Sequence, residues 1–449
     1  MGRPAASETD ARLLGFWPCL ALVVGTLIGS GIYLLPAQLA PYGWNALFGW
    51  LITIGGALCL AFLFARLAQA VPSAAGPYAY VDQAFGRLPA FAIAWSYWIS
   101  IWVGNAAIAV AAASYLSLLV PALAERPGVG AAAAAALLWL LTALNCVSLR
   151  AVGGFQLLTA VLKLVPLIVV ILIAAGLLVS GSAPAPAVEG PPVNLGDINS
   201  AAALALWPML GIEAAAWASR NVRNPARNVP RATLTGTLLV ALLYLLVSTA
   251  ILTLMPAAEV GASDAPIALF VERFSGAGFG LVIGIFAAIS VIGALNGLIL
   301  LQGELPLAMA RDGAFPRWFA GLSPAGRPVR ALVTSSLLTT LLILANSSRS
   351  LAGLFSFMAL LSTVAALVLY FTVAVSSIEL QRRNRIETRP ALLIASLAGA
   401  VYALWTFQGA GLEATGWGLV LIAAGLPLYV LMRGRRSPRK SRQTTFAGD

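Results

Sequence analysis

The chain has 449 residues, of which 60% are hydrophobic and 10% are charged, and its mean hydropathy is +0.91. Soluble domains carry about a quarter charged residues, so this composition excludes a soluble globular protein and indicates a membrane protein. The net charge of +11 would suit a nucleic-acid partner. The basic residues, however, follow the connections between apolar runs, with Lys163 as an exception, which argues against nucleic-acid binding.

A helix that crosses a hydrocarbon core of roughly 30 Å needs about 20 apolar residues, and about twelve runs meet that length. Because they show no strand alternation, the sequence predicts an all-α membrane protein rather than a β-barrel. The runs are 14–39, 44–65, 89–120, 130–147, 153–179, 199–219, 232–255, 276–308, 331–346, 350–378, 391–409 and 413–432.

Basic residues crowd every second connection, and acidic residues lie mostly in the others. Arginines cluster, for example, at 220–231, 311–330 and 382–389, while Glu259, Asp264 and Glu413 fall in the alternate connections. Since positively charged loops stay in the cytoplasm, both termini are predicted to be cytoplasmic. The tail RGRRSPRKSRQ (433–443) fits a basic anchor beside anionic lipid headgroups. The polar start Met1–Asp10 lacks a basic signal region, so the first helix is expected to be retained.

The first apolar run contains GTLIGSGIYLLP (25–36), with Gly25, Gly29, Ser30 and Gly31 at its middle. A G-x-x-x-G pattern alone would fit close helix packing. Consecutive small residues with low helix propensity go further and predict an interruption of the helix.

A second interruption is predicted in the sixth run, where ALWPMLGIEAA (205–215) contains Pro208 and Gly211. The two breaks lie five runs apart, which fits two inverted five-helix repeats over 13–180 and 199–378. The remaining units would be a cytoplasmic N-terminus (1–12), an outer loop (181–198), two further helices (390–432) and a basic tail (433–449). Half-helix ends at the midplane attract carboxylates and ammonium groups, so a substrate bearing both, such as an amino acid, is expected.

Two charged side chains, Glu213 and Lys163, fall well inside predicted spans. Charges at such depth cost roughly 2.5 to 3.5 kcal/mol and usually serve function. Two interpretations are open: the two charges neutralise each other or fix helix register, or one of them exchanges a proton during transport. Because the chain has no histidine, no other obvious proton carrier lies at the midplane.

Aromatic residues gather near the same depth. SYWISIWVGN (96–105) brings together Tyr97, Trp98, Trp102 and Asn105, and Trp207 directly precedes the second break. Membrane aromatics often serve interfacial belts or packing instead. Trp207 is the stronger pocket candidate, because it flanks the break and can stack on a cation.

With these motifs in hand, the chain resembles the amino acid–polyamine–organocation superfamily, and most closely its basic amino acid/polyamine antiporters of the arginine/agmatine type. The resemblance covers nearly the whole chain. It rests on GTLIGSGIYLLP, PSAAGPYAYVDQAFG (72–86), YWISIWVGN, LWPMLGIEAA, NPARNVPRAT (224–233) and ARDGAFP (310–316). It implies a twelve-helix, LeuT-like fold with helices 1 and 6 interrupted, a location in a bacterial-type plasma (inner) membrane, a homodimer, and exchange by alternating access.

The resemblance also implies substrate-site residues. Ser30 and Gly31 would meet a substrate carboxylate beside Thr26 and Leu27. The walls and floor would come from Tyr97, Ser100, Ile101, Asn105, Trp207, Leu210 and Leu298. Glu213 matches an acidic position linked to proton-dependent gating.

Three positions separate the chain from the arginine exchangers. Those exchangers have Asn where this chain has Thr26, and a Trp that helps hold a guanidinium where it has Leu298. Lys163 instead resembles the fifth-helix lysine of sodium-independent neutral amino acid transporters, whose ammonium replaces a sodium ion. Arginine-like and neutral substrates, antiport and proton-coupled uptake therefore remain open.

Two other classes compete with a transporter. A channel would need a continuous polar lining, which the third and eighth helices do not supply. A membrane enzyme would need a metal cluster or a nucleophile–base pair. The sequence offers neither, and Cys19, Cys59 and Cys146 lie in apolar runs without ligand spacing. We therefore expect a secondary transporter without a cofactor, whose partners are an amino acid or related amine and membrane lipid.

Overall fold

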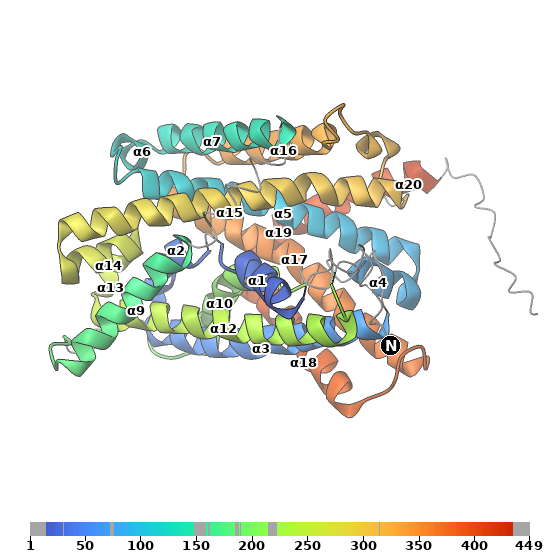
Figure 1. The fold of residues 1–449 in the computed structure, drawn as a ribbon, viewed down its shortest axis with the longest axis horizontal. Helices are drawn as coiled ribbons and strands as arrows, with labels where there is room; N and C mark the ends of the chain where they lie inside the picture. Colours follow the sequence, from blue (N-terminus) through green and yellow to red (C-terminus); the bar gives the residue numbers. More distant parts are fainter. Residues whose placement is uncertain are drawn as a thin grey trace, which may run out of the picture.

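A computed structural model describes residues 15–29, 31–71, 76–147, 159, 162–184, 188, 190–213, 222–313 and 315–433. The described chain is built from helices (Figure 1). Their bounds are α1 Phe16–Leu27, α2 Gly31–Leu39, η2 Ala40–Tyr42, α3 Trp44–Ala70, α4 Pro77–Phe85, α5 Arg87–Leu116, α6 Ala122–Glu125, α7 Pro127–Val147, α9 Leu164–Val179, α10 Leu195–Leu206, η3 Trp207–Met209, α12 Pro225–Leu254, α13 Ala257–Gly261, α14 Pro266–Ser275, α15 Ala277–Arg311, η5 Arg317–Ala320, α16 Val329–Ala345, α17 Leu351–Arg382, α18 Pro390–Gly409, α19 Gly411–Ala423 and α20 Gly425–Arg433.

Eight of the described helical segments are long and apolar enough to cross a membrane. The bent pair α1 and α2 with η2 makes a ninth if it is one span, and its two parts are inclined at 42°. The apolar helices α9 and α16 have only 16 and 17 residues, and α10 has 12. The all-helical membrane architecture is therefore as expected, whereas twelve complete spans are not established.

Local sequence explains where several helices begin. Gly86 adopts φ +84° before α5, and Gly276 adopts φ +96° before α15, a conformation that favours glycine. The Ser350 hydroxyl accepts a hydrogen bond from the Gly353 amide at the start of α17, and the Asn194 side chain does the same for Asp197 at the start of α10. These glycines and capping side chains therefore determine where α5, α10, α15 and α17 begin.

The helices form two groups with the broken helices between them. In Figure 1, α7, α16, α15 and α5 lie on one side and α3 and α12 on the other, with α1, α2 and α10 between. α5 packs on α15, α7 and α17 and is almost wholly buried, whereas α12 and α10 pack on α3 and α1 packs on α12. The interrupted segments therefore lie between the two groups, and α5 is the most buried of the eight described candidate spans.

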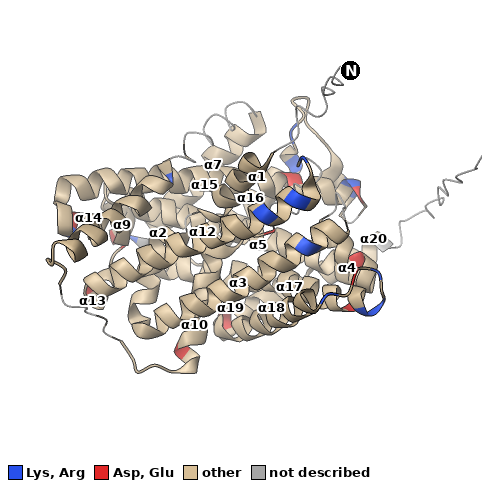
Figure 2. Cartoon of the chain, turned by 60° about the horizontal axis from the view of Figure 1, so that its bottom comes forward, with Lys and Arg blue, Asp and Glu red and all other residues tan. Residues whose placement is uncertain are grey.

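Basic residues mark one end of the bundle. In Figure 2 most lysines and arginines gather toward the end where α4 and α20 are labelled. Arg66, Arg311 and Arg382 lie at the C-terminal ends of α3, α15 and α17, and Arg87 and Arg330 at the N-terminal ends of α5 and α16. The alternation of charge along the sequence thus becomes a charge difference between the two ends.

Candidate functional site

In the described residues, a helix ends at each of the two predicted interruptions. α1 ends at Leu27 and α2 begins at Gly31. α10 ends at Leu206, a single 3₁₀ turn follows, and the chain is extended at Leu210 with φ −66° and ψ 138°. Pro208 lacks the N–H that would continue the helix, and Gly211 adopts φ +110°, which other residues rarely tolerate. We refer to the last turn of α1 with the start of α2 as the first break (residues 25–31, of which residue 30 lies outside the described part of the chain), and to residues 207–213 as the second break.

The two breaks touch each other. A β-carbon added to Gly31 would lie 2.5 Å from the Pro208 β-carbon and 3.1 Å from Trp207 Cδ1. One added to Gly211 would lie 2.9 Å from Thr26 Cγ2. The glycines are therefore required by close approach of the two interrupted segments.

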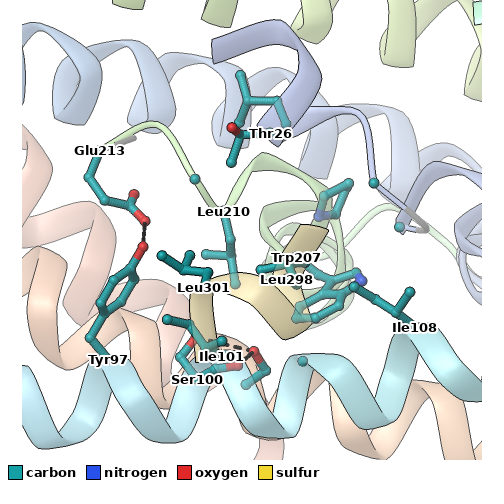
Figure 3. Close-up of a pocket in the computed structure, with 17 residues that line it drawn as sticks. Thr26, Tyr97, Ser100, Ile101, Ile108, Trp207, Leu210, Glu213, Leu298 and Leu301 are labelled. Carbon is teal, nitrogen blue, oxygen red and sulfur yellow. Dashed lines mark hydrogen bonds between the residues drawn. The ribbon is translucent and has the colours of Figure 1, made fainter. Parts of the chain in front are cut away.

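A pocket opens where the breaks meet α5, α15 and α17 (Figure 3). Ten of the predicted site residues line it, namely Thr26, Leu27, Gly31, Tyr97, Ser100, Ile101, Trp207, Leu210, Glu213 and Leu298. Residues predicted from distant parts of the sequence are thus brought to one place.

Backbone groups of the first break are held by side chains from other helices. Lys163, directly before α9, donates from Nζ to the Gly25 carbonyl at 3.1 Å. The Tyr244 hydroxyl on α12 donates to the Leu27 carbonyl at 2.8 Å. These are carbonyls of the last turn of α1, which lack helical partners. Lys163 is 2% exposed, so a buried cation sits at the negative end of this half-helix.

Glu213 lies at the far side of the second break, between two tyrosines. Tyr97 on α5 donates to one carboxyl oxygen at 2.6 Å, and Tyr370 on α17 donates to the other at 2.8 Å. Figure 3 shows the Tyr97 contact at the pocket edge. Lys163 and Glu213 form no ion pair with each other in the described part of the chain, so their interpretation as a neutralising pair does not hold.

The floor of the pocket combines hydroxyls with apolar side chains. Ser100 and Ser362 lie with their Oγ atoms 3.2 Å apart, and Ser362 donates to the Ser100 carbonyl at 2.7 Å. Gly104 leaves room for the Trp207 ring, because a β-carbon there would lie 2.9 Å from Trp207 Cη2. Leu298 lies beside Trp207 in Figure 3, so an aliphatic side chain occupies this part of the wall.

Two predicted residues do not line the pocket, and a third lies outside the described residues. Asn105 is buried and donates to Gln302 Oε1 at 2.7 Å, and Gln302 continues to Ser336 at 2.8 Å. Lys163 acts behind the first break rather than on the pocket surface. Ser30 lies outside the described residues.

Sequence reasoning did not single out several lining residues. Gly104, Ile108, Leu301 and Ser362 line the pocket, and Tyr370 holds Glu213. Gly104 and Ile108 follow Ser100 at helical spacing on the same face of α5, which is a signal that the sequence carries. Ser362 and Tyr370 belong to a helix that had no broken or charged segment to mark it.

Residues 14–426 match a family model described as amino acid permease. The chain belongs to the amino acid permease family. This permease is 30% identical to the cadaverine/lysine antiporter of Escherichia coli K12, over 90% of its own length and 91% of the relative's. It is 30% identical to a putative arginine/ornithine antiporter of Bacillus subtilis 168, over 81% and 84% of the two chains. The putrescine transporter of E. coli K12 is 27% identical over 96% and 98%. Family membership and the apolar helices together identify an integral membrane permease.

Proposed function

We propose that the chain is a secondary active amino acid exchanger that works by alternating access and needs no sodium. The observation that carries this proposal is the pocket at the contact between the two breaks. There, the N-terminal end of α2 and the C-terminal end of α1 approach the same space from opposite directions. Such a pair of helix ends suits a ligand with one carboxylate and one ammonium group.

In the proposed complex, the carboxylate meets backbone N–H groups at the start of α2, near Gly31. The ammonium group lies toward the C-terminal end of α1, near Thr26. The side chain then extends toward Ser100, Ile101 and Leu298 on the facing helices. Trp207 forms the lid over this space, because it begins the 3₁₀ turn of the second break and lines the pocket.

Sodium independence follows from Lys163. Its ammonium occupies a place against the Gly25 carbonyl, as a bound cation would. A fixed positive charge there removes the need for an ion that must bind and leave in each cycle. We assign Glu213 the gating role, because it connects the second break to α5 and α17 through two tyrosine hydroxyls. Proton uptake by Glu213 during opening would couple transport to pH.

The proposed complete architecture has twelve membrane helices, with inverted repeats over 13–180 and 199–378 and two further helices within 390–432. The contact between the two breaks supports this arrangement, since equivalent helices of inverted repeats meet at the substrate site. The outer loop is 181–198, and the termini 1–12 and 433–449 face the cytoplasm of a bacterial cell. We further propose a homodimer.

The relatives bear the names of lysine, cadaverine, arginine, ornithine and putrescine carriers. We therefore propose amino acids and their amines as the substrate class. Amino acids are preferred because the site offers one helix end for a carboxylate and another for an ammonium group. Exchange of polyamines is the second candidate, favoured by the diamine carriers among the relatives.

Counterflow in proteoliposomes tests this proposal. Vesicles are loaded in turn with lysine, ornithine, arginine, leucine, cadaverine or putrescine, and uptake of the labelled compound is measured in sodium or choline buffer. We expect uptake to require an internal amino acid, to be equal in the two buffers, and to be weaker for decarboxylated analogues. Equal or tighter binding of cadaverine than of lysine would place the polyamine function first, and uptake without any internal substrate would contradict exchange.

A further inference from the structure

Tyr33 lies on α2, two residues after the pocket residue Gly31, and its side chain is fully buried. Its hydroxyl donates to the backbone carbonyl of Lys163 at 2.7 Å. The ring packs edge-on against Tyr115, with centroids 5.9 Å apart and planes at 80°. Tyr33 thus reaches from the first broken helix to the start of α9, 130 residues further along the chain.

The turn around Lys163 has one helical hydrogen bond fewer than an uninterrupted helix. α9 begins at Leu164, and Pro166 at its third position has no N–H, so the Leu162 carbonyl, one position before Lys163, receives no helical hydrogen bond from it. On the N-terminal side, the Lys163 amide donates to the Thr159 carbonyl at 3.0 Å. The Tyr33 hydroxyl therefore holds a turn that its own helix bonds secure incompletely.

Lys163 carries the contact onward. Its ammonium donates to the Gly25 carbonyl of α1, so a continuous path runs from Tyr33 on α2 through Lys163 to Gly25 on α1. We call this path the Tyr33 relay. It joins the two halves of the first broken helix through a residue that belongs to neither half.

We propose that Tyr33 is a positioning residue that keeps the Lys163 ammonium against α1, so that α1 stays packed only while α2 holds its place. The proposal rests on alternating access as given under Proposed function. Gly31 brings α2 to the pocket two residues before Tyr33. A ligand that moves α2 would therefore act on the Lys163 contact and, through it, on α1.

A native thiol can report the position of α1. Cys19 lies on α1 with 0% exposure, and α1 packs against α12. The chain contains three cysteines, so Cys59→Ala and Cys146→Ala leave Cys19 as the single thiol. Its rate of modification by a water-soluble maleimide then measures how often α1 leaves its packed position.

The experiment compares Tyr33→Phe with the unchanged residue in this single-cysteine background. Loss of one hydrogen bond should raise the fraction of open α1, and so the labelling rate, roughly threefold to tenfold. Tyr402→Phe serves as the matched control, since Tyr402 is a buried tyrosine on α18, outside the relay. We expect it to leave the labelling rate unchanged.

A double-mutant cycle identifies the route. Lys163→Gln alone should also speed labelling, and adding Tyr33→Phe to it should have no further effect, because Tyr33 acts through Lys163. Unchanged labelling in Tyr33→Phe would overturn the proposal. If Tyr33→Phe speeds Cys19 labelling equally with Lys163 and with Lys163→Gln, the proposal is also overturned. The Tyr33 hydroxyl would then stabilise the packing of α1 without acting through Lys163.

Labelling needs no transported substrate, so this result is independent of counterflow. Absent exchange with an intact labelling cycle would contradict the proposed transport function and leave the Tyr33 relay standing. Normal exchange with a failed labelling cycle would contradict the Tyr33 relay and leave the proposed transport function standing.

Discussion

The polar groups at the two helix breaks are stabilised in different ways. At the first break, the segment itself carries no charge, and Lys163 and Tyr244 from other helices bind its carbonyls. At the second break, the segment carries its own charge on Glu213, and hydroxyls from α5 and α17 hold it. The first break therefore depends on a cation supplied from outside, whereas the second supplies an anion to its neighbours. From this difference we expect the first break to contribute mainly to substrate binding and the second break, through Glu213, mainly to gating.

The largest expected effect falls where the two breaks touch. Gly31→Ala should weaken substrate binding roughly a hundredfold, because overpacking against Pro208 costs up to about 3 kcal/mol, and Gly31→Val should abolish binding. Binding is measured by scintillation proximity or calorimetry on purified protein. Gly55→Ala on α3 is the control, since nothing lies within 4 Å of a β-carbon there. Normal binding by Gly31→Ala would show that the breaks separate in the bound state.

The dependence of the first break on an outside cation is tested at Lys163. Lys163→Gln should lower the exchange rate by roughly ten- to a hundredfold, because the Gly25 carbonyl loses a charged donor. The measurement is initial counterflow rate at matched amounts of inserted protein. Wild-type exchange should be unchanged when choline replaces sodium. A strong sodium requirement in the wild type, or full activity of Lys163→Gln, would remove the lysine from the mechanism.

The signalling role of the second break is tested at Glu213. In Glu213→Gln one carboxyl oxygen is replaced by an NH₂ group that cannot accept, so one tyrosine hydroxyl must stop donating there and accept instead, and exchange should slow roughly tenfold. The pH dependence of the wild type across pH 5 to 8 should become flat in this variant. A wild-type pH profile that persists in Glu213→Gln would assign the proton to another group, and a flat wild-type profile would make Glu213 a purely structural anchor.

The smallest expected effect concerns side-chain selectivity. Leu298→Trp should improve arginine binding roughly threefold to fivefold relative to leucine, since a ring beside the substrate can stack on a guanidinium. Competition of each amino acid against the labelled substrate gives the ratio, and Leu298→Met controls for a change of shape without an aromatic ring. An unchanged ratio would show that the substrate side chain does not reach α15.

The features predictable from sequence were local ones. Gly29 and Gly31 mark the first break, and Pro208 and Gly211 mark the second, because their backbone preferences act within a single turn. Lys163 was singled out locally, as a charge inside an apolar run, and its ammonium is found against the Gly25 carbonyl of the first helix. Most of the predicted site residues line one pocket, since helical spacing on α5 and the family resemblance together placed them.

The site contacts that could not be predicted from the sequence depend on packing between helices that lie far apart in the chain. Tyr370 meets Glu213 across 157 residues, and no local pattern in α17 distinguishes it from other buried aromatics. Asn105 was expected to face a substrate, yet its amide donates to Gln302 on α15. Side-chain direction at such positions follows from the rotation of two long helices against each other, which hydropathy and motif spacing do not determine.

The contact between Gly31 and Pro208 also has a genetic consequence. Because Pro208 fills the space that a side chain at position 31 would need, a larger residue at 31 requires a change at or near position 208. A selection for regained growth after Gly31→Ala should therefore return second-site changes at Pro208 or Trp207 more often than on the outer helices. Substitutions at the two positions would then occur together, although the positions lie 177 residues apart in the chain.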